Sequence, residues 1–307
     1  MVMTNNLAIF THVDLDGAGS PVVAKYLYGD RVKEVFRVDN KDVTEKVQYL
    51  IDNKENYKDS TIFICDHSPT FEMYNKLVES GLDFYIFDHH KSSELQELND
   101  YRVEINTDFC GTYLFFDWLV MNDPELTPEQ INSTQDFVYH VNDYDMWIHE
   151  SPKSKQLHQL LYELGWNRFL DRFSSNIKVE FNEGEKLILE LARERVQDYV
   201  ESYRDKVTVL TDNLGDTYIA VFAERNQSEL GHYLLETFGV KYVCMINPKS
   251  LGCSLRGNGE VDVSEIARNK AKLYSSQSGG HKSAAGFSYT LDDLSDIIER
   301  LFRLNVL

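Results

Sequence analysis

Cysteine is scarce in this chain, and the few cysteines form no paired motif. Four cysteines occur among 307 residues, and no two of them stand in a C-x-x-C arrangement. The chain therefore lacks the sequence signature of a disulfide framework. We expect reduced, structural thiols in a cytoplasmic protein at Cys65, Cys110, Cys244 and Cys253.

Long apolar runs are also missing. No stretch approaches the ~20 apolar residues that are needed to cross a bilayer. The first residues show neither the positive charge nor the apolar run of a secretory signal. These absences argue against a membrane protein and lead us to expect a soluble, cytoplasmic one.

Positive charge is the third shortage. The chain has 31 Lys and Arg residues against 50 Asp and Glu residues, which gives a formal net charge of −19. Affinity for long DNA or RNA comes largely from basic side chains that displace counterions from phosphates. The charge balance therefore disfavours long nucleic acids, and a short oligonucleotide or a small nucleotide is the easier substrate to accept.

The hydrophobic pattern predicts an α/β fold in the first half of the chain. Short apolar runs alternate with amphipathic stretches such as Phe71–Ser80, and residues 127–139 begin with a helix-capping pattern. This order indicates a doubly wound, mostly parallel sheet with helices on both faces. The expected strands are Leu7–Val13, Val32–Asp39, Thr61–Asp66, Asp83–Asp88 and Tyr101–Asn106.

The second half of the chain predicts a helical connector and a smaller α/β domain. Charge-rich helical patterns fill residues 151–204, and strands then alternate with helices again. The predicted domains are therefore 1–150, 151–204 and 205–307. The expected strands here are Lys206–Asp212, Thr217–Ala223, Tyr242–Pro248, Gly252–Gly257 and Gly286–Leu291, with helices at Ser228–Phe238, Asp262–Lys272 and Asp292–Arg303.

Acids and histidines follow three strands of the predicted parallel sheet. In such sheets, ligands bind outside the carboxyl ends of the strands. So many carboxylates without matching basic residues would repel one another, and divalent cations would relieve that repulsion. Mixed imidazole and carboxylate ligands suit Mn²⁺, and one shared carboxylate would make a two-metal site for phosphoester hydrolysis. The residues concerned are His12, Asp14, Asp16, Asp66, Asp88, His89 and His90, with Asp143 and Asp145 farther along.

Five motifs in order resemble those of one enzyme family. They are "HVDLDG", "CDHS", "FDHH", "NDYDMW" and "GGHKSAAGF". Together they resemble the DHH phosphoesterase superfamily, in the branch that carries a C-terminal DHHA1 domain. That branch includes RecJ-type exonucleases, nanoRNases (oligoribonucleases) that degrade short oligonucleotides, and phosphodiesterases that act on cyclic-dinucleotide products. The resemblance implies a DHH catalytic domain, followed after the connector by a DHHA1 substrate-binding domain.

The resemblance also implies roles for the clustered residues. It places Asp14 at a first metal ion, Asp66 between two ions, and Asp16, His89 and Asp143 at the second. The family's more common pattern has a histidine at the position of Phe10, so His12 is our candidate for the nitrogen ligand of the first ion. Asp88 is expected to orient its neighbours, His90 to face the phosphate, and Asp145 to support the ligands rather than bind metal.

The second domain is expected to bind the substrate. Seven basic and three acidic residues fall within residues 241–282, so this segment has a net positive charge although the whole chain has a net charge of −19. The guanidinium of Arg256 can hold a phosphate in two hydrogen bonds, and glycines let backbone amides approach an anion. By resemblance, the end of the substrate is held by Arg256, Gly279, Gly280 and His281. The aromatic residues Phe115, Phe116 and Trp118 are expected in the core rather than in a base-stacking platform.

These features together predict a phosphodiesterase with two Mn²⁺ ions, for which Mg²⁺ or Co²⁺ could substitute. It would hydrolyse short oligonucleotides of RNA or DNA to mononucleotides with metal-activated water, with His90 and Asp66 as catalytic residues. The alternatives are a RecJ-like single-strand exonuclease and a phosphodiesterase for pAp or cyclic dinucleotides. An inactive nucleotide-binding scaffold is the alternative outside the enzymes, and a homodimer is compatible with all of them.

Overall fold

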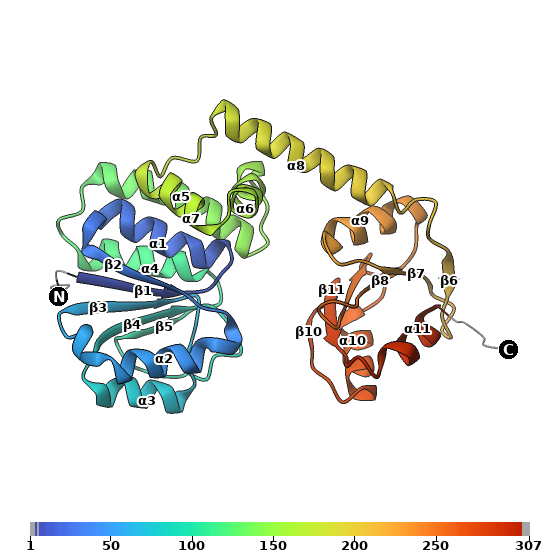
Figure 1. The fold of residues 1–307 in the computed structure, drawn as a ribbon, viewed down its shortest axis with the longest axis horizontal. Helices are drawn as coiled ribbons and strands as arrows, with labels where there is room; N and C mark the ends of the chain where they lie inside the picture. The colour runs from blue at the N-terminus through green and yellow to red at the C-terminus, as the bar shows by residue number, and fades with distance from the viewer. Residues whose placement is uncertain (1–3, 5, 303–307) are drawn as a thin grey trace. The chain divides into compact units, whose positions relative to one another are not determined.

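The computed structural model describes residue 4 and residues 6–302. Backbone contacts divide the chain into two compact units, which meet between Glu190 and Leu191. No helix within the described residues is long and apolar enough to span a membrane. Each unit is built on one β-sheet with helices on both faces (Figure 1).

The sheet of the first unit is parallel throughout. Its five strands lie in the order β2-β1-β3-β4-β5. This arrangement confirms the predicted doubly wound sheet, although the last strand is shorter than the sequence pattern suggested. The strands are β1 (Asn6–Thr11), β2 (Val32–Arg37), β3 (Ser60–Cys65), β4 (Asp83–Asp88) and β5 (Val103–Ile105).

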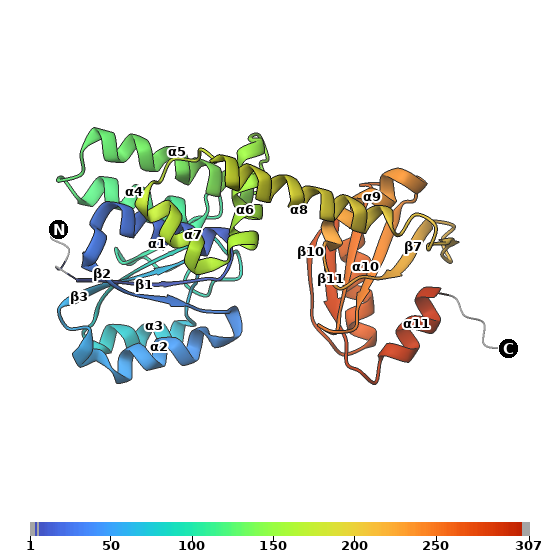
Figure 2. The ribbon, with the colours of Figure 1, turned by 45° about the horizontal axis from the view of Figure 1, so that its top comes forward.

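Helices cover both faces of this sheet, and each face has its own hydrophobic core. Alternate residues of a strand point to opposite faces, so Leu7 and Ile9 enter one core while Ala8 and Phe10 enter the other. The first core is covered by α1 (Leu15–Tyr28), α4 (Gly111–Asn122), α5 (Pro128–Asp145), α6 (Pro152–Leu164) and α7 (Trp166–Ser175), and the second by α2 (Val43–Asp52) and α3 (Phe71–Ser80) (Figure 2).

The helix predicted at residues 127–139 is α5, and it is longer than expected. Thr127 and Gln130 form the predicted capping box at its start. The helix then continues to Asp145, so "NDYDMW" lies across its last turn. The aromatic residues Phe115 and Phe116 of α4 are buried in the first core, and Trp118 packs against that core.

The helical connector is shorter than predicted. Residues 151–204 were expected to join the domains, but Leu160 and Phe173 are buried in the core of the first unit. Helices α6 and α7 therefore belong to that unit, because their apolar faces pack there. The segment that runs from one unit into the other is α8 (Glu183–Glu201), whose residue Val200 is buried in a core of the second unit.

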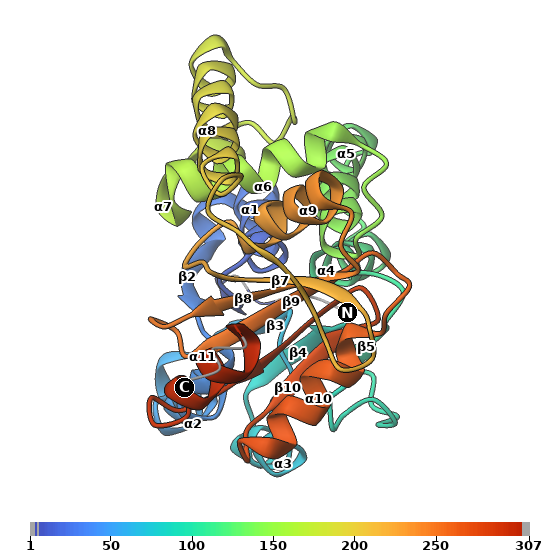
Figure 3. The same ribbon diagram turned by 90° about the vertical axis from the view of Figure 1, so that its right-hand side faces the viewer.

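The second unit has a mixed six-stranded sheet in the order β10-β11-β9-β8-β7-β6. Among its described strands, β7 and β8 are the parallel neighbours, and the other pairs are antiparallel. Helix α9 lies on one face and α10 with α11 on the other (Figure 3). The elements are β6 (Val209–Thr211), β7 (Thr217–Phe222), α9 (Gln227–Phe238), β8 (Tyr242–Asn247), β9 (Gly252–Gly257), α10 (Val263–Leu273), β10 (Ser278–His281), β11 (Ala284–Ser288) and α11 (Leu294–Phe302).

Candidate metal centre

Three strands of the first sheet end at the same level. Thr11, Cys65 and Phe87 lie side by side in the register of β1, β3 and β4. Strands β1 and β3 end there and β4 ends one residue later, at Asp88, so the residues that follow all three leave the sheet at one edge. The strand order changes direction between β1 and β3, and such a switch point is where ligands bind in open α/β sheets.

His12 and Asp14 follow β1 and are fixed by the start of α1. Asp14 caps that helix, because the Gly17 amide donates to Asp14 Oδ1 over 2.9 Å. His12 Nδ1 donates to Asp14 Oδ2 over 2.8 Å and lies 3.6 Å from Asp66 Oδ2. A side chain at Gly17 would place Cβ 2.2 Å from the carbonyl oxygen of His12, so the glycine of "HVDLDG" is required by space.

Asp16, in the first turn of α1, is completely buried, and its carboxylate faces the start of α4. Its two carboxylate oxygens accept from the amides of Gly111 and Thr112, each over 2.7 Å. These amides have no partner inside the helix, and the helix N-terminus favours a negative charge. A Cβ on Gly111 would lie 2.7 Å from the Asp66 amide nitrogen. Sequence reasoning missed Gly111 and Thr112, although a small residue at the start of a helix was a usable signal.

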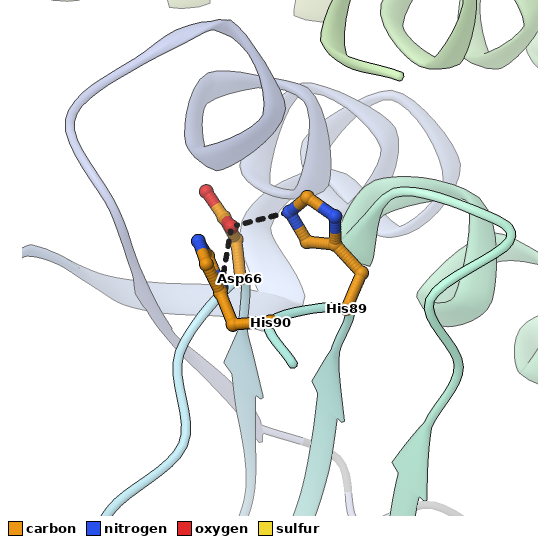
Figure 4. A group of neighbouring side chains, drawn as sticks. All are labelled: Asp66, His89 and His90. Carbon is orange, nitrogen blue, oxygen red and sulfur yellow. Dashed lines mark ion pairs between the residues drawn. The ribbon is translucent and has the colours of Figure 1, made fainter. Parts of the chain in front are cut away.

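Asp66 lies between the histidines that follow β4 (Figure 4). Its Oδ1 is 3.3 Å from His89 Nε2 and 3.9 Å from His90 Nδ1. Its Oδ2 is buried and has no hydrogen-bond partner among the described residues. The backbone of Asp66 is left-handed, with φ +55°, a conformation that is uncommon outside glycine and costly to maintain.

Asp88 is buried and its carboxylate contacts both histidines that follow β4. Its Oδ1 accepts from His90 Nδ1 over 2.7 Å and from the His89 amide over 2.8 Å. Its Oδ2 accepts from the hydroxyl of Ser68. Both oxygens of Asp88 are thus engaged, and the hydrogen bond from Nδ1 fixes the orientation of the His90 ring.

The structure exchanges the positions expected for Asp143 and Asp145. The Asp143 carboxylate, predicted as a metal ligand, turns away and accepts from the amides of Glu150 and Ser151, over 2.8 and 3.3 Å. Asp145, predicted as a support, lies at the site: its buried Oδ2 is 3.4 Å from His89 Nε2. The physical reason is that α5 continues through both residues and directs them to different sides.

The site brings its ligand atoms into three groups, each small enough to hold one ion. The atoms of each group lie within 4.8 Å of one another, and Asp66 and His89 each belong to two groups. The groups are His12 with Asp14 and Asp66, Asp16 with His89 and Asp145, and Asp66 with His89 and His90. A residue that belongs to two groups can hold two neighbouring cations close together.

The electrostatics of the site also suit a cation. Burial, and then the charge of Asp16, raise the pKa of Asp66 and of Asp145. The hydrogen bond to Asp14, and then the nearby carboxylate of Asp66, raise the pKa of His12 to about 10. Bound protons thus offset the negative charge of the crowded carboxylates, and divalent cations offset the same charge in metal sites. The buried Oδ2 atoms of Asp66 and Asp145, which lack hydrogen-bond partners within the described part of the chain, fit this role.

The residues predicted to bind substrate share one edge of the second sheet. Arg256, Ala284 and His281 lie opposite one another on β9, β11 and β10, and hence on one face. Arg256 Nη2 donates to Ser228 Oγ at the start of α9 over 2.8 Å. Gly279 and Gly280 form part of strand β10 instead of a loop. Gly280 has φ +127°, and a Cβ there would lie 2.4 Å from the Ala285 Cα.

Comparisons with known proteins agree with this architecture. The model of the DHH family N-terminal domain matches residues 6–163, and that of the DHHA1 domain matches residues 215–305. Oligoribonuclease NrnB of Bacillus subtilis (strain 168) is 27% identical over 318 residues, which cover 97% of this chain and 76% of that protein.

Two solved structures share the fold. RecJ from Thermus thermophilus, in complex with Mn²⁺, matches with a TM-score of 0.57 and 15% identity, over 96% of this chain and 51% of RecJ. The pGpG-specific phosphodiesterase PggH from Vibrio cholerae matches with a TM-score of 0.54 and 11% identity, over 97% of this chain and 98% of that one. The chain belongs to the DHH family of metal-dependent enzymes that hydrolyse phosphoester bonds, and it carries a DHHA1 domain.

Proposed function

We propose that this protein is a Mn²⁺-dependent phosphodiesterase that hydrolyses short oligonucleotides to mononucleotides. The observation that carries the proposal is the shared position of Asp66. Its two oxygens face different groups of ligands, with Oδ2 near His12 and Oδ1 near His89. A carboxylate in this position is suited to bridge two ions of a phosphoester-cleaving site.

In this proposal one ion is held by His12, Asp14 and Asp66, and the other by Asp16, Asp66, His89 and Asp145. Asp145 takes the place that the sequence suggested for Asp143, because only its carboxylate lies in a ligand group. Mixed nitrogen and oxygen donors favour Mn²⁺, with Mg²⁺ or Co²⁺ as substitutes. Bound there, the ions would supply Lewis acidity to the phosphate and to an attacking water.

His90 is the residue of the site that we propose to contact the phosphate. Its hydrogen bond to Asp88 raises its pKa and so favours the protonated ring, which donates a charge-assisted hydrogen bond toward negative charge. Nδ1 is engaged by Asp88, so Nε2 is the nitrogen that can face the substrate. A cavity of about 320 Å³, whose lining includes five hydroxyl-bearing side chains, borders Asp88 and His90 and offers room for part of a nucleotide.

The preference for short substrates is supported by charge and by similarity. A net charge of −19 opposes accumulation on a long polyanion. The similarity to an oligoribonuclease extends over 97% of this chain and 76% of that protein. Arg256 and His281, which share one sheet face, are proposed to bind the terminal phosphate of the substrate.

The variant Asp66→Asn tests the proposal. It keeps the size of the side chain but removes the charge that two ions would share, and we expect hydrolysis of a dinucleotide with Mn²⁺ to fall at least about 100-fold. Asp52→Asn, an exposed position at the end of α2, is the matched control and should retain wild-type turnover. Mn²⁺-dependent turnover that survives in Asp66→Asn would refute the assignment.

A further inference from the structure

The loop that follows α5 exposes two large apolar side chains beside the metal centre. Trp147 is 64% exposed and Ile148 is 49% exposed. By contrast, Phe115 and Phe116 are buried in the core. An exposed indole at the edge of a polar site is not needed for packing, so a binding role has to be considered.

The backbone of this loop is held in an unfavourable shape. Trp147 and His149 both have φ +58°, the left-handed region that bulky residues rarely adopt. Asp143 maintains this shape. Its carbonyl oxygen accepts from the amides of Ile148 and His149, and its carboxylate accepts from those of Glu150 and Ser151. Four hydrogen bonds to one residue make the loop a fixed support for the indole.

His149 supports the indole from inside the protein. The two rings meet nearly perpendicularly, with centroids 4.1 Å apart, and His149 also packs edge-on against Tyr144. Both ring nitrogens of His149 are buried and lack hydrogen-bond partners among the described residues. This imidazole is therefore used for ring packing, and it keeps Trp147 in place without covering it.

Trp147 is close to Asp145, a residue of the metal centre, by covalent geometry alone. Two Cα–Cα steps separate it from Asp145, so the two Cα atoms are at most ~7.6 Å apart. A base attached to the nucleotide at the metal centre can span such a distance. Because every base has a π-face, an exposed and rigid indole binds bases with little regard to sequence.

We propose that Trp147 is a stacking platform for the nucleobase next to the scissile phosphate. This inference rests on the proposed function, since the base belongs to the oligonucleotide substrate. It assigns Asp143 a role as well: this residue fixes the loop that follows Asp145 and presents Trp147 to the base.

The kinetic test compares Trp147→Ala and Trp147→Phe on a dinucleotide with Mn²⁺. Loss of stacking should raise KM about tenfold in Trp147→Ala and change kcat by less than about twofold, while Trp147→Phe stays near the wild type. Tyr162→Ala, on α6, is the matched control because Tyr162 is 76% exposed and also aromatic. An unchanged KM in Trp147→Ala, or an equal rise in Tyr162→Ala, would overturn the inference.

A fluorescence titration with AMP separates this inference from the proposed function. AMP should quench the tryptophan emission of the wild type, and Trp147→Phe, which retains Trp118 and Trp166, should lose that quenching. Quenching at Trp147 in a protein that hydrolyses no oligonucleotide would support the platform and refute the function. Absence of quenching would refute the platform. So would a dimeric wild type that Trp147→Ala converts to a monomer without a change in KM, because Trp147 would then serve an interface between subunits.

Discussion

Asp143 and Asp145 are two residues apart, yet they perform different tasks. Asp145 lies beside His89 with a buried oxygen that lacks a hydrogen-bond partner in the described chain, whereas Asp143 accepts four amide hydrogen bonds from its own loop. A buried carboxylate among other carboxylates costs stability until a cation binds. A carboxylate that accepts hydrogen bonds from backbone amides contributes stability without a cation. The metal centre therefore depends on both residues, but through different interactions.

The variants Asp145→Ala and Asp143→Ala should separate these tasks. We expect Asp145→Ala to weaken Mn²⁺ binding at least about tenfold and to leave the metal-free protein as stable as before or more so. Asp143→Ala should lower the free energy of unfolding by about 1–3 kcal/mol, because it removes the acceptors of two amides. Calorimetric Mn²⁺ titration and thermal unfolding measure the two effects. The opposite assignment of effects would restore Asp143 as the ligand.

Most elements of the fold could be predicted from the sequence, and the exceptions have physical reasons. The parallel strands were recognisable because apolar runs of 4–8 residues alternate with amphipathic helices. The end of α5 was missed because residues 140–151 contain no glycine or proline that would mark where the helix stops. Strand β10 was missed because "SGGH" has little strand propensity and is held by its pairing with β11.

The packing of α5 against α6 predicts a dependence of stability on pH. His140 on α5 is buried, its Nδ1 lies 3.2 Å from Ser154 Oγ on α6, and burial lowers its pKa. As the pH falls below the ordinary histidine value of ~6.5, the unfolded chain takes up a proton that the folded one resists, so stability decreases. The free energy of unfolding of His140→Gln should therefore fall less than that of the wild type as the pH is lowered.

Urea unfolding of the wild type and of His140→Gln between pH 7.5 and 5 measures this effect. The difference between the two proteins isolates His140 from the histidines of the metal centre, whose pKa values shift upward. Identical pH profiles would show that His140 takes up its proton as readily in the folded protein as in the unfolded one.

At the scale of the whole molecule, ordered motifs carried more information than any single one. The residues that follow β1, β3 and β4 could be assigned to one edge because parallel strands end together. The sequence did not reveal that α4 points its first amides at Asp16, since a contact between residues so far apart along the chain leaves no local pattern. The boundary at Glu190 was likewise hidden, because helices of a connector and helices of a core have the same periodicity.

The central claim is that the protein hydrolyses short oligonucleotides. A product-resolved Mn²⁺ assay on RNA and DNA strands of about 2 to 24 residues, with pAp and linear and cyclic dinucleotides beside them, tests it most directly. We expect the highest kcat/KM on strands of two to five residues, because a chain with a net charge of −19 gains little from a longer polyanion. Processive digestion of the longest DNA at a higher kcat/KM would contradict the claim and identify a RecJ-like exonuclease instead.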